Sequence, residues 1–211
     1  GWEVVITAGP THEKIDPVRF IGNHSSGEMG YALAEECAAR GADVYLVSGP
    51  VQIKAKHPNI KTISVVSAGE MFEAASAEFD SSDITILCAA VADFRPETQA
   101  DEKIKREKDD LVIRLKPTQD IAANLGSRKK ENQILVGFAL ETNNEAENAQ
   151  GKLKRKNLDF IVLNSLKDEN ACFGYDTNKI TIIEKNGNTQ AFSLKSKTEV
   201  AKDIIDKVCK E

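Results

Sequence analysis

Short apolar runs alternate along the chain with longer stretches of helical periodicity. The apolar runs predict β-strands at residues 4–7, 44–48, 62–66, 84–88, 134–140 and 160–164. The stretches between them, where apolar residues recur every three or four positions, predict helices at residues 27–40, 68–79, 120–129 and 145–156. The strands are continuously apolar, which is typical of parallel strands covered on both faces. We therefore predict a Rossmann-like, doubly wound α/β fold, with a mostly parallel sheet and helices on both faces.

One internal segment departs from this alternation. Residues 97–110 (ETQADEKIKREKDD) hold ten charged residues in fourteen. Charges at this density cannot enter a core without a large desolvation cost, so the segment is predicted to form a solvated loop or flap. No internal repeat, low-complexity tract or linker divides the rest of the chain. We expect a single domain over residues 1–211.

The C-terminal part predicts a hairpin followed by a helix. Residues 180–184 and 190–194 form the two strands, because the Asn186-Gly187 pair between them tolerates the positive φ angles of a tight turn. A final amphipathic helix is predicted at residues 197–210. An exposed strand edge invites pairing, so we expect the hairpin to extend a sheet or to contribute to a subunit interface.

Composition narrows the class of protein. A hydrophobic fraction of 41% is enough for a full core, which excludes global disorder. A net charge of −5 argues against a nucleic-acid-binding surface. No apolar run approaches the roughly 18–20 residues that span a membrane, and no signal peptide opens the chain. We expect a soluble, cytoplasmic protein with no nucleic-acid or membrane partner, and a natural polypeptide that extends upstream of residue 1.

The cysteines and histidines are not spaced along the chain as metal ligands usually are. The four cysteines lack a C-x-x-C pair, which predicts reduced structural thiols and leaves zinc or disulfide use as the less favoured interpretation. They are Cys37, Cys88, Cys172 and Cys209. The three histidines, at positions 12, 24 and 57, are equally scattered.

Residues 20–30 (FIGNHSSGEMG) form a polar, glycine-rich segment that opens the helix at residues 27–40. The first N–H groups of a helix lack intrahelical partners and its dipole favours negative charge. The segment therefore predicts an anion site. Ser25 and Ser26 offer a second interpretation, in which they only cap the helix.

A dinucleotide site is the first alternative for such a segment. Its fingerprint requires G-x-G-x-x-G and an acidic residue at the end of the second strand. Here the glycines fall at 22, 27 and 30, and the second strand ends in Ser48 and Gly49. An NAD(P)-dependent Rossmann oxidoreductase is thus the less favoured hypothesis. The P-loop pattern G-x-x-x-x-G-K-[ST] is absent, which excludes a P-loop NTPase.

Loops at the carboxyl edge of an α/β sheet bind ligands, and the loops predicted there carry distinctive residues. Asp93 follows a run of small residues, Phe138 lies near a strand end, Lys103 lies on the flap, and Lys152 and Lys156 share one helix face. Taken singly, the lysine pair also suits a solvated face and Phe138 a core position. Together they predict lysines, backbone amides and a carboxylate that converge on one sheet edge. This combination suits a nucleoside triphosphate bound with a divalent cation.

Several motifs resemble those of bacterial phosphopantothenate–cysteine ligase, also called phosphopantothenoylcysteine synthetase. The resemblance covers nearly the whole chain in order, and the motifs are ITAGPT at 6–11, DPVRF at 16–20, NHSSG at 23–27, AAVAD at 89–93, KIK at 103–105, GFALET at 137–142 and KNLD at 156–159. It implies a Rossmann-like domain, a homodimer, and fusion in many bacteria to an upstream flavin-dependent decarboxylase.

The resemblance also implies the reaction. The carboxylate of 4′-phosphopantothenate attacks the α-phosphate of CTP, which gives an acyl-cytidylate and pyrophosphate with the support of Mg²⁺. The amine of L-cysteine then attacks the activated carbonyl, which forms the amide and releases CMP. The residues alone leave CTP and ATP open, and the choice of CTP follows from the bacterial character of the motifs.

Residue by residue, the resemblance assigns Asn23 to the acyl centre as an oxyanion donor and Lys103 to the nucleotide phosphates from a mobile flap. The implied substrate-binding residues are Gly22, Asn23, His24, Ser25, Ser26 and Gly27. The implied nucleotide-binding residues are Ala89, Asp93, Gln119, Asp120, Ile121, Ala122, Phe138, Lys152 and Lys156. It identifies no direct metal ligand.

Two positions depart from the family pattern. Glu28 stands where the family commonly has a basic residue, and the turn at residues 117–121 lacks the proline that often precedes its aspartate. Both put the details of anion and nucleotide affinity in doubt, and neither touches Asn23 or Lys103. A third hypothesis, a catalytically silent nucleotide-binding module, would be favoured if either of those two residues were missing, and both are present.

Overall fold

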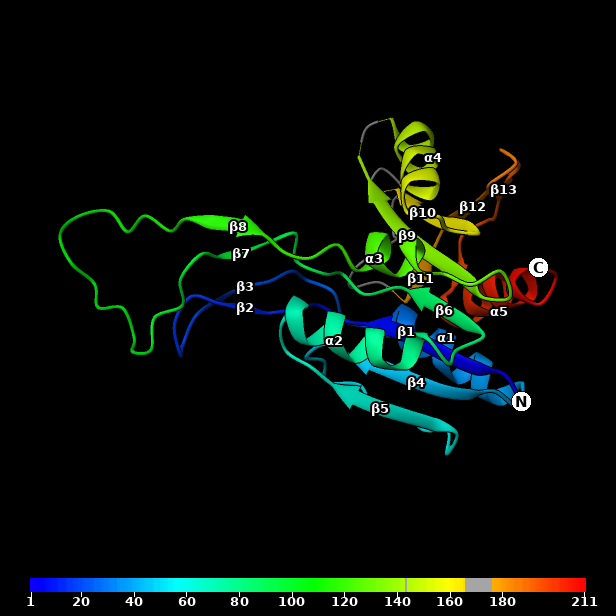
Figure 1. Ribbon diagram of the computed structural model, residues 1–211, viewed down its shortest axis with the longest axis horizontal. Helices are drawn as coiled ribbons and strands as arrows, with labels where there is room; N and C mark the ends of the chain where they lie inside the picture. Colours follow the sequence, from blue (N-terminus) through cyan, green and yellow to red (C-terminus); the bar gives the residue numbers. More distant parts are fainter. Residues whose placement is uncertain (143, 166–175) are drawn as a thin grey trace.

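The computed structural model describes residues 1–142, 144–165 and 176–211, and it is built around one eight-stranded sheet (Figure 1). The strands, in the order in which they lie side by side, are β13 (Thr189–Ala191), β12 (Ile180–Glu184), β10 (Phe160–Ser165), β9 (Ile134–Glu141), β6 (Ile84–Leu87), β1 (Glu3–Ala8), β4 (Asp43–Ser48) and β5 (Ile60–Ser64). The run from β10 to β5 is parallel, and the hairpin β12–β13 adds antiparallel to β10. The hairpin therefore extends the sheet, as predicted.

Helices cover both faces of this sheet. Helices α1 (Glu28–Ala39) and α5 (Lys197–Val208) contribute to one apolar cluster. Helices α2 (Ala68–Phe79), α3 (Ile121–Ser127) and α4 (Glu145–Arg155) contribute to the other. Successive residues of a strand point to opposite faces, so Val4 belongs to the first cluster and Val5 to the second. The doubly wound α/β prediction is confirmed.

The predicted boundaries hold best where the chain is buried. Helix α2 begins and ends at the predicted residues, while β5 begins two residues earlier than predicted, at Ile60. β5 is an edge strand whose side chains at 61, 62 and 64 are exposed. Because its residues need not be apolar, the hydrophobic pattern marks its ends poorly.

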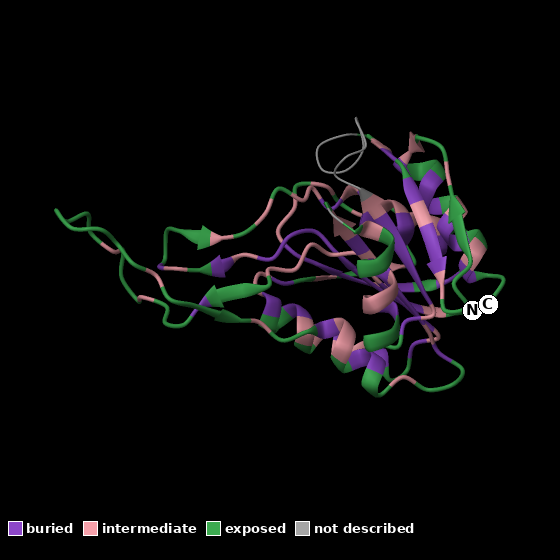
Figure 2. Cartoon of the chain, turned by 90° about the horizontal axis from the view of Figure 1, so that it is seen from above, coloured by how far each residue is buried: buried purple, intermediate pink, exposed green. Residues whose placement is uncertain are grey.

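A long arm leaves the body of the molecule at the carboxyl edge of the sheet (Figure 1). It consists of two short antiparallel pairs, and these are β2 (Glu13–Lys14) with β3 (Phe20–Ile21) and β7 (Phe94–Pro96) with β8 (Leu115–Pro117). Residues 97–110 connect β7 toward β8 without helix or strand and are almost entirely exposed (Figure 2). In the structure the charged segment is a solvent-exposed loop, and its role as a flap stays a prediction. The short strands that carry it were not predicted, since they bury too few residues to show a pattern.

The start of α5 is held by a further small pair of strands. β11 (Thr177–Asn178) pairs with β14 (Lys195–Ser196), directly before the helix. Of the residues named in the sequence analysis, Cys172 lies outside the described residues. Within the described residues, no helix is long and apolar enough to cross a membrane.

Candidate active site

Two cavities lie at the carboxyl edge of the parallel strands, where the strand order changes direction between β1 and β6. The loop after β1 begins at Gly9 and the loop after β6 begins at Cys88. The Ala90 N–H donates to the Gly9 carbonyl at 2.9 Å, and Pro10 and Ala90 form a parallel bridge. The two loops are therefore held side by side at the position where α/β sheets bind ligands.

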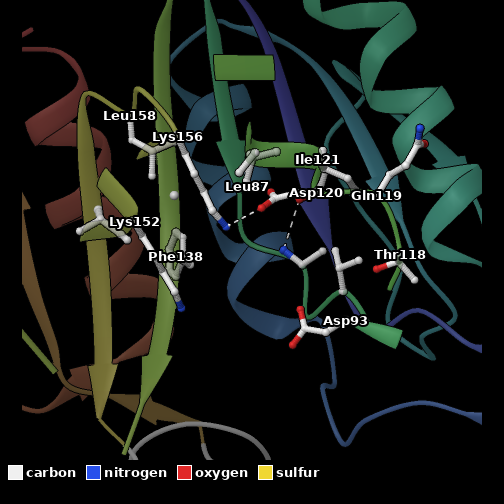
Figure 3. Close-up of a pocket in the computed structure, with 16 residues that line it drawn as sticks. Leu87, Asp93, Thr118, Gln119, Asp120, Ile121, Phe138, Lys152, Lys156 and Leu158 are labelled. Atoms are coloured by element: carbon white, nitrogen blue, oxygen red, sulfur yellow. Dashed lines mark hydrogen bonds and ion pairs between the residues drawn. The ribbon is translucent and has the colours of Figure 1, made fainter. Parts of the chain in front are cut away.

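The first cavity has a volume of about 300 Å³ and is bounded by the loop after β6, the start of α3 and the end of α4 (Figure 3). Apart from Lys103 on the flap, it brings together the residues that were predicted to bind the nucleotide, and these are Ala89, Asp93, Gln119, Asp120, Ile121, Ala122, Phe138, Lys152 and Lys156. They come from four separate parts of the chain. Lys152 and Lys156 both reach this cavity because they lie four residues apart on one helix face.

Asp120 and Lys156 form an ion pair across the first cavity. The Lys156 ammonium lies 3.1 Å from the Asp120 carboxylate (Figure 3), and the same carboxylate caps α3 by accepting the Ala123 N–H at 3.0 Å. Burial raises the pKa of Asp120, but the hydrogen bond from Ala123 and the contact with Lys156 outweigh burial and hold this pKa below its ordinary value. Asp120 is therefore an anion that positions Lys156.

The other lysine of the first cavity has its own carboxylate. The Lys152 ammonium lies 2.5 Å from Glu141 at the end of β9, and the two side chains are 34% and 15% exposed. Each lysine of the pair is thus balanced by a carboxylate within the ligand-free protein. A polyphosphate that entered the cavity would compete for both ammonium groups.

The second cavity has a volume of about 350 Å³ and contains the glycine-rich segment. Four of the residues that were predicted to bind substrate line it, and these are Asn23, Ser25, Ser26 and Gly27. Gly22 and His24 are exposed and do not line it. Their prediction as substrate-binding residues has no support in this geometry, because the chain alternates in direction here and every second residue turns to solvent.

Asn23 ties the two sides of the second cavity together. Its Nδ2 donates to the Ala90 carbonyl at 2.7 Å, and its Oδ1 accepts the Ser25 N–H at 3.1 Å. A carboxamide carries two N–H groups, and the Ala90 carbonyl engages one of them. The side chain is thereby fixed in place between the loop after β6 and the start of α1.

The start of α1 is open to the second cavity. Gly27 is its N-cap, with φ 80° in the left-handed region that favours glycine, and this residue has no side chain with which to cap the helix. The Ser26 hydroxyl accepts the N–H of Glu28, the first residue of α1, at 3.5 Å, so the capping interpretation holds in part. The Ser25 hydroxyl accepts the Gly27 N–H at 3.3 Å, one residue before the helix. Because the Ser26 contact is long, the first turn retains the electrostatic character of an anion site.

The polar residues Asn164, Asn178 and Lys197 are among those that line the second cavity without having been predicted. Oδ1 of Asn164 is buried and has no hydrogen-bond partner among the described residues. A buried acceptor without a donor is costly, so a ligand N–H or O–H is the natural partner here. Lys197 pairs with Glu28 at 3.2 Å. The sequence signal was weak, because Lys197 lies 169 residues from its partner.

Lys103 is the predicted catalytic residue that the structure does not bring to the cavities. It is exposed on the arm and lines neither of them. Its neighbour Ile104 is held near the root of the arm, where the Asp16 carboxylate accepts the Ile104 N–H at 3.0 Å and the Arg19 guanidinium donates to the Ile104 carbonyl at 2.6 Å. A role for Lys103 at the site stays a prediction, and it requires the flap to move.

The side chains of the described residues show whether a protein-held metal ion or a dinucleotide is expected. Across residues 1–142, 144–165 and 176–211, no group of three or more His, Cys, Asp or Glu side chains is arranged to hold a metal ion. At the end of β4, the buried Ser48 hydroxyl donates to the Gly49 carbonyl at 2.8 Å and accepts the Tyr31 hydroxyl at 2.9 Å. This position therefore offers no carboxylate for a ribose diol, which disfavours the NAD(P) alternative.

Comparison with known proteins identifies the family to which the chain belongs. The family model of the DNA/pantothenate metabolism flavoprotein C-terminal domain matches residues 1–211. The chain is 60% identical over 208 residues to a cysteine/cysteine sulfinic acid decarboxylase from an unknown prokaryotic organism, covering 99% of this chain and 58% of that protein. It is 49% identical over 208 residues to the coenzyme A biosynthesis bifunctional protein CoaBC of Bacillus subtilis (strain 168), covering 99% of this chain and 51% of that protein.

A solved structure gives the same result. The crystal structure of the C-terminal domain of the coenzyme A biosynthesis bifunctional protein CoaBC is 41% identical and matches with a TM-score of 0.84, covering 99% of this chain and 94% of that one. The chain spans little more than half the length of the curated relatives named above. It therefore belongs to the family of the DNA/pantothenate metabolism flavoprotein C-terminal domain and has the fold of the C-terminal domain of CoaBC.

Proposed function

We propose that this domain is a phosphopantothenate–cysteine ligase of coenzyme A biosynthesis, which uses CTP and proceeds through an acyl-cytidylate. The observation that carries the proposal is that the two cavities share residues. Ala89, Val91, Asp93 and Phe138 line both. A ligand in one cavity and a ligand in the other would therefore meet at these residues, which is what the transfer of a nucleotidyl group to a carboxylate requires.

In this proposal the first cavity binds the nucleotide. Lys152 and Lys156 exchange their carboxylate partners for phosphate oxygens, and the amides at the start of α3 contribute further donors. The donors suit Mg²⁺, because that ion is commonly held by one or two carboxylates together with substrate phosphates. Asp93 is the carboxylate shared by both cavities and is the residue we expect to hold it. The ion would neutralise charge on the phosphates.

The second cavity binds the acyl substrate in the same scheme. The carboxylate of 4′-phosphopantothenate attacks the α-phosphorus, pyrophosphate leaves, and the acyl-cytidylate forms. The cysteine amine then adds to the acyl carbon, an amine proton is lost, and CMP leaves with the bonding electrons. The second N–H of Asn23 donates to the oxyanion of this addition, a contribution of about 10²–10³ in rate. Lys103 reaches the phosphates when the flap closes.

The test is incubation of the protein with CTP, Mg²⁺ and 4′-phosphopantothenate, with and without L-cysteine. We expect pyrophosphate in both reactions and CMP with 4′-phosphopantothenoylcysteine only when cysteine is added. Pyrophosphate without any amide product upon cysteine addition would refute the ligase. ATP in place of CTP tests the nucleotide preference. Asn23→Asp is expected to slow amide formation strongly, and wild-type turnover in that variant would remove Asn23 from the mechanism.

Two control reactions address the other hypotheses. Oxidation or reduction of NAD(P) by the isolated domain would favour the oxidoreductase alternative. Release of CO₂ from cysteine alone would favour the activity in the name of the 60%-identical relative, of which this chain covers 58%.

We further propose a cytoplasmic homodimer, which in its natural context is fused to an upstream flavin-dependent decarboxylase. Full-length expression followed by flavin absorbance tests the fusion.

A further inference from the structure

A buried lysine from the C-terminal helix lies in the second cavity. The Lys197 side chain is only 10% exposed, and its ammonium lies 3.2 Å from the Glu28 carboxylate. Burial raises the pKa of the Cys88 thiol to about 12, and the positive charge of Lys197 opposes part of that rise. The ammonium is therefore close to the end of β6, in the part of the cavity that faces the loops of the site.

The backbone of Lys197 is fixed by the elements around it. Its N–H donates to the Asp176 carbonyl at 2.9 Å, next to the β11–β14 pair. Directly before it, Ser196 and Glu199 form a capping box, with both hydrogen bonds at 3.2 Å. The backbone of Lys197 is thus fixed before any ligand arrives, so ligand binding needs little further ordering of this backbone.

Two helices open onto the cavity at this point. Lys197 contacts Glu28 at their starts, and Arg40 after the end of α1 contacts Asp206 of α5 at 2.8 Å. The helices therefore run parallel, and both positive ends face the same way. At the start of α1 the N-cap Gly27 has no side chain, and the Ser26 hydroxyl meets the Glu28 N–H only at 3.5 Å. The start of α5 is already satisfied by its capping box, so the start of α1 and the Lys197 ammonium are what favour a ligand of high negative charge over a neutral one.

Some residues line the second cavity but not the first, and they indicate which end of the acyl substrate lies near Lys197. Asn23, placed at the acyl carbon, is one of them, and the others include Lys197, Glu28, Asn178 and Gly27. In the proposed function the substrate carboxylate lies between the shared residues and Asn23, so the opposite end of the acid reaches the remaining unshared residues. That end carries the phosphate ester. Glu28, with a side chain 37% exposed, is able to turn into solvent when a phosphate replaces it.

We propose that Lys197 is the residue that recognises the phosphate of the acyl substrate, and that Glu28 is its resting counter-ion. This inference rests on the proposed function for the identity of the acid. It also explains how the chain accommodates Glu28 at a position next to an anion site. The positive charge comes from α5, and the carboxylate of Glu28 holds the ammonium in the cavity until the phosphate binds.

The experiment compares Lys197→Met with wild type, using 4′-phosphopantothenate and unphosphorylated pantothenate as the acids. A charge-assisted hydrogen bond corresponds to about 10- to 100-fold in affinity, so we expect the KM for 4′-phosphopantothenate to rise by about that factor. The KM for CTP and the activity with pantothenate should stay unchanged. Glu28→Gln should lower the KM for the phosphorylated acid, by less than about fivefold because its pair is partly exposed.

Matched controls keep the result interpretable. Lys195→Met removes a lysine two positions earlier, which pairs with Asp203 at 2.7 Å outside the cavity, and should leave every KM unchanged. Lys197→Arg retains the charge and should restore most of the affinity. If Lys197→Met fails to fold, Lys197→Gln replaces it. An unchanged KM for 4′-phosphopantothenate in a folded, uncharged variant overturns the proposal.

Calorimetry separates this proposal from the proposed function, because it needs no turnover. We expect 4′-phosphopantothenate and inorganic phosphate to bind wild type and to compete, with weaker binding to Lys197→Met. Such binding without any amide product would refute only the ligase. Product formation with equal affinities in wild type and variant would refute only the role of Lys197.

Discussion

At the scale of single residues, Gly126 fixes the lysine that faces Asp120. A Cβ at position 126 would lie 1.8 Å from the Lys156 carbonyl oxygen, and Asn157 donates to the Gly126 carbonyl at 3.0 Å. The end of α3 therefore rests directly on the backbone that follows α4. Lys156 reaches the first cavity from this contact, so the packing of α3 on the backbone after α4 sets the position of a side chain that lines the cavity.

Gly126→Ala is therefore expected to displace Lys156. We expect a loss of about 1–3 kcal/mol in the free energy of unfolding, as for other overpacked positions, together with weaker CTP binding. Gly69→Ala is the matched control, because the nearest atom to a Cβ there is Ser67 Oγ at 3.8 Å. That exposed position in α2 should gain about 0.5–1 kcal/mol. Urea unfolding measures both, and equal effects would contradict the packing argument.

How far the site was predictable also depends on individual residues. The residues that line the first cavity were predicted because their motifs are local, and Lys152 and Lys156 share a face by helical periodicity alone. Lys197 and Asn164 were missed because nothing nearby in the sequence marks them. They reach the cavity through the crossing of the sheet and the packing of α5 on α1. Contacts of this kind follow from topology and need the folded structure.

At the scale of elements, Asp16 joins the root of the arm to the flap. Its side chain is fully buried, and its oxygens accept N–H groups from Val18, Arg19 and Ile104. The Arg19 guanidinium holds the pKa of Asp16 well below its ordinary value; burial opposes this effect, and the backbone N–H groups add to it. The charged form of Asp16 therefore stabilises the anchored arm.

The sign of the pH dependence follows from this lowered pKa. The contribution of Asp16 is fully present above its ordinary value of 3.8 and is lost as the pH falls through the lower, folded-state value. We expect Asp16→Asn to destabilise the protein at pH 7, and the difference from wild type to shrink as the pH falls below about 4. Urea unfolding across this range measures it. Asp110→Asn, an exposed change on the same arm, should show no such trend, and a constant difference for Asp16→Asn would contradict the linkage.

The elements of the body were predictable and those of the arm were not. Strands such as β1 and β6 are buried on both faces, so their apolar runs are visible in the sequence. The arm strands β2, β3, β7 and β8 are two or three residues long and mostly exposed. The charge of residues 97–110 predicted a solvated segment, but it gave no information on the strands that project it away from the body.

At the scale of the whole molecule, the arm is the most unusual surface. Among the described residues, most of the large hydrophobic side chains that are exposed lie on the arm, and the exceptions are Trp2 and Leu194. Those on the arm are Val18, Phe20, Phe94, Leu111, Val112 and Leu115. A soluble protein rarely leaves such a group uncovered. The short strands of the arm also present unpaired edges. Both features suit burial against the arm of a second copy, in line with the expected homodimer.

The final prediction tests that interface. Stable pairs bury about 800 Å² per partner, and the arm projects from the body with most of its residues exposed (Figures 1 and 2). We expect wild type to sediment as a dimer, and Val18→Asp combined with Val112→Asp to sediment as a folded monomer, because Val18 and Val112 are 61% and 87% exposed in the single chain. Leu194→Asp alters an exposed apolar residue away from the arm and should leave the dimer intact.

A monomeric wild type, or a dimer that survives both arm substitutions, would exclude the arm as the interface. Since the arm also carries Lys103, the monomeric variant would further show whether flap function depends on pairing.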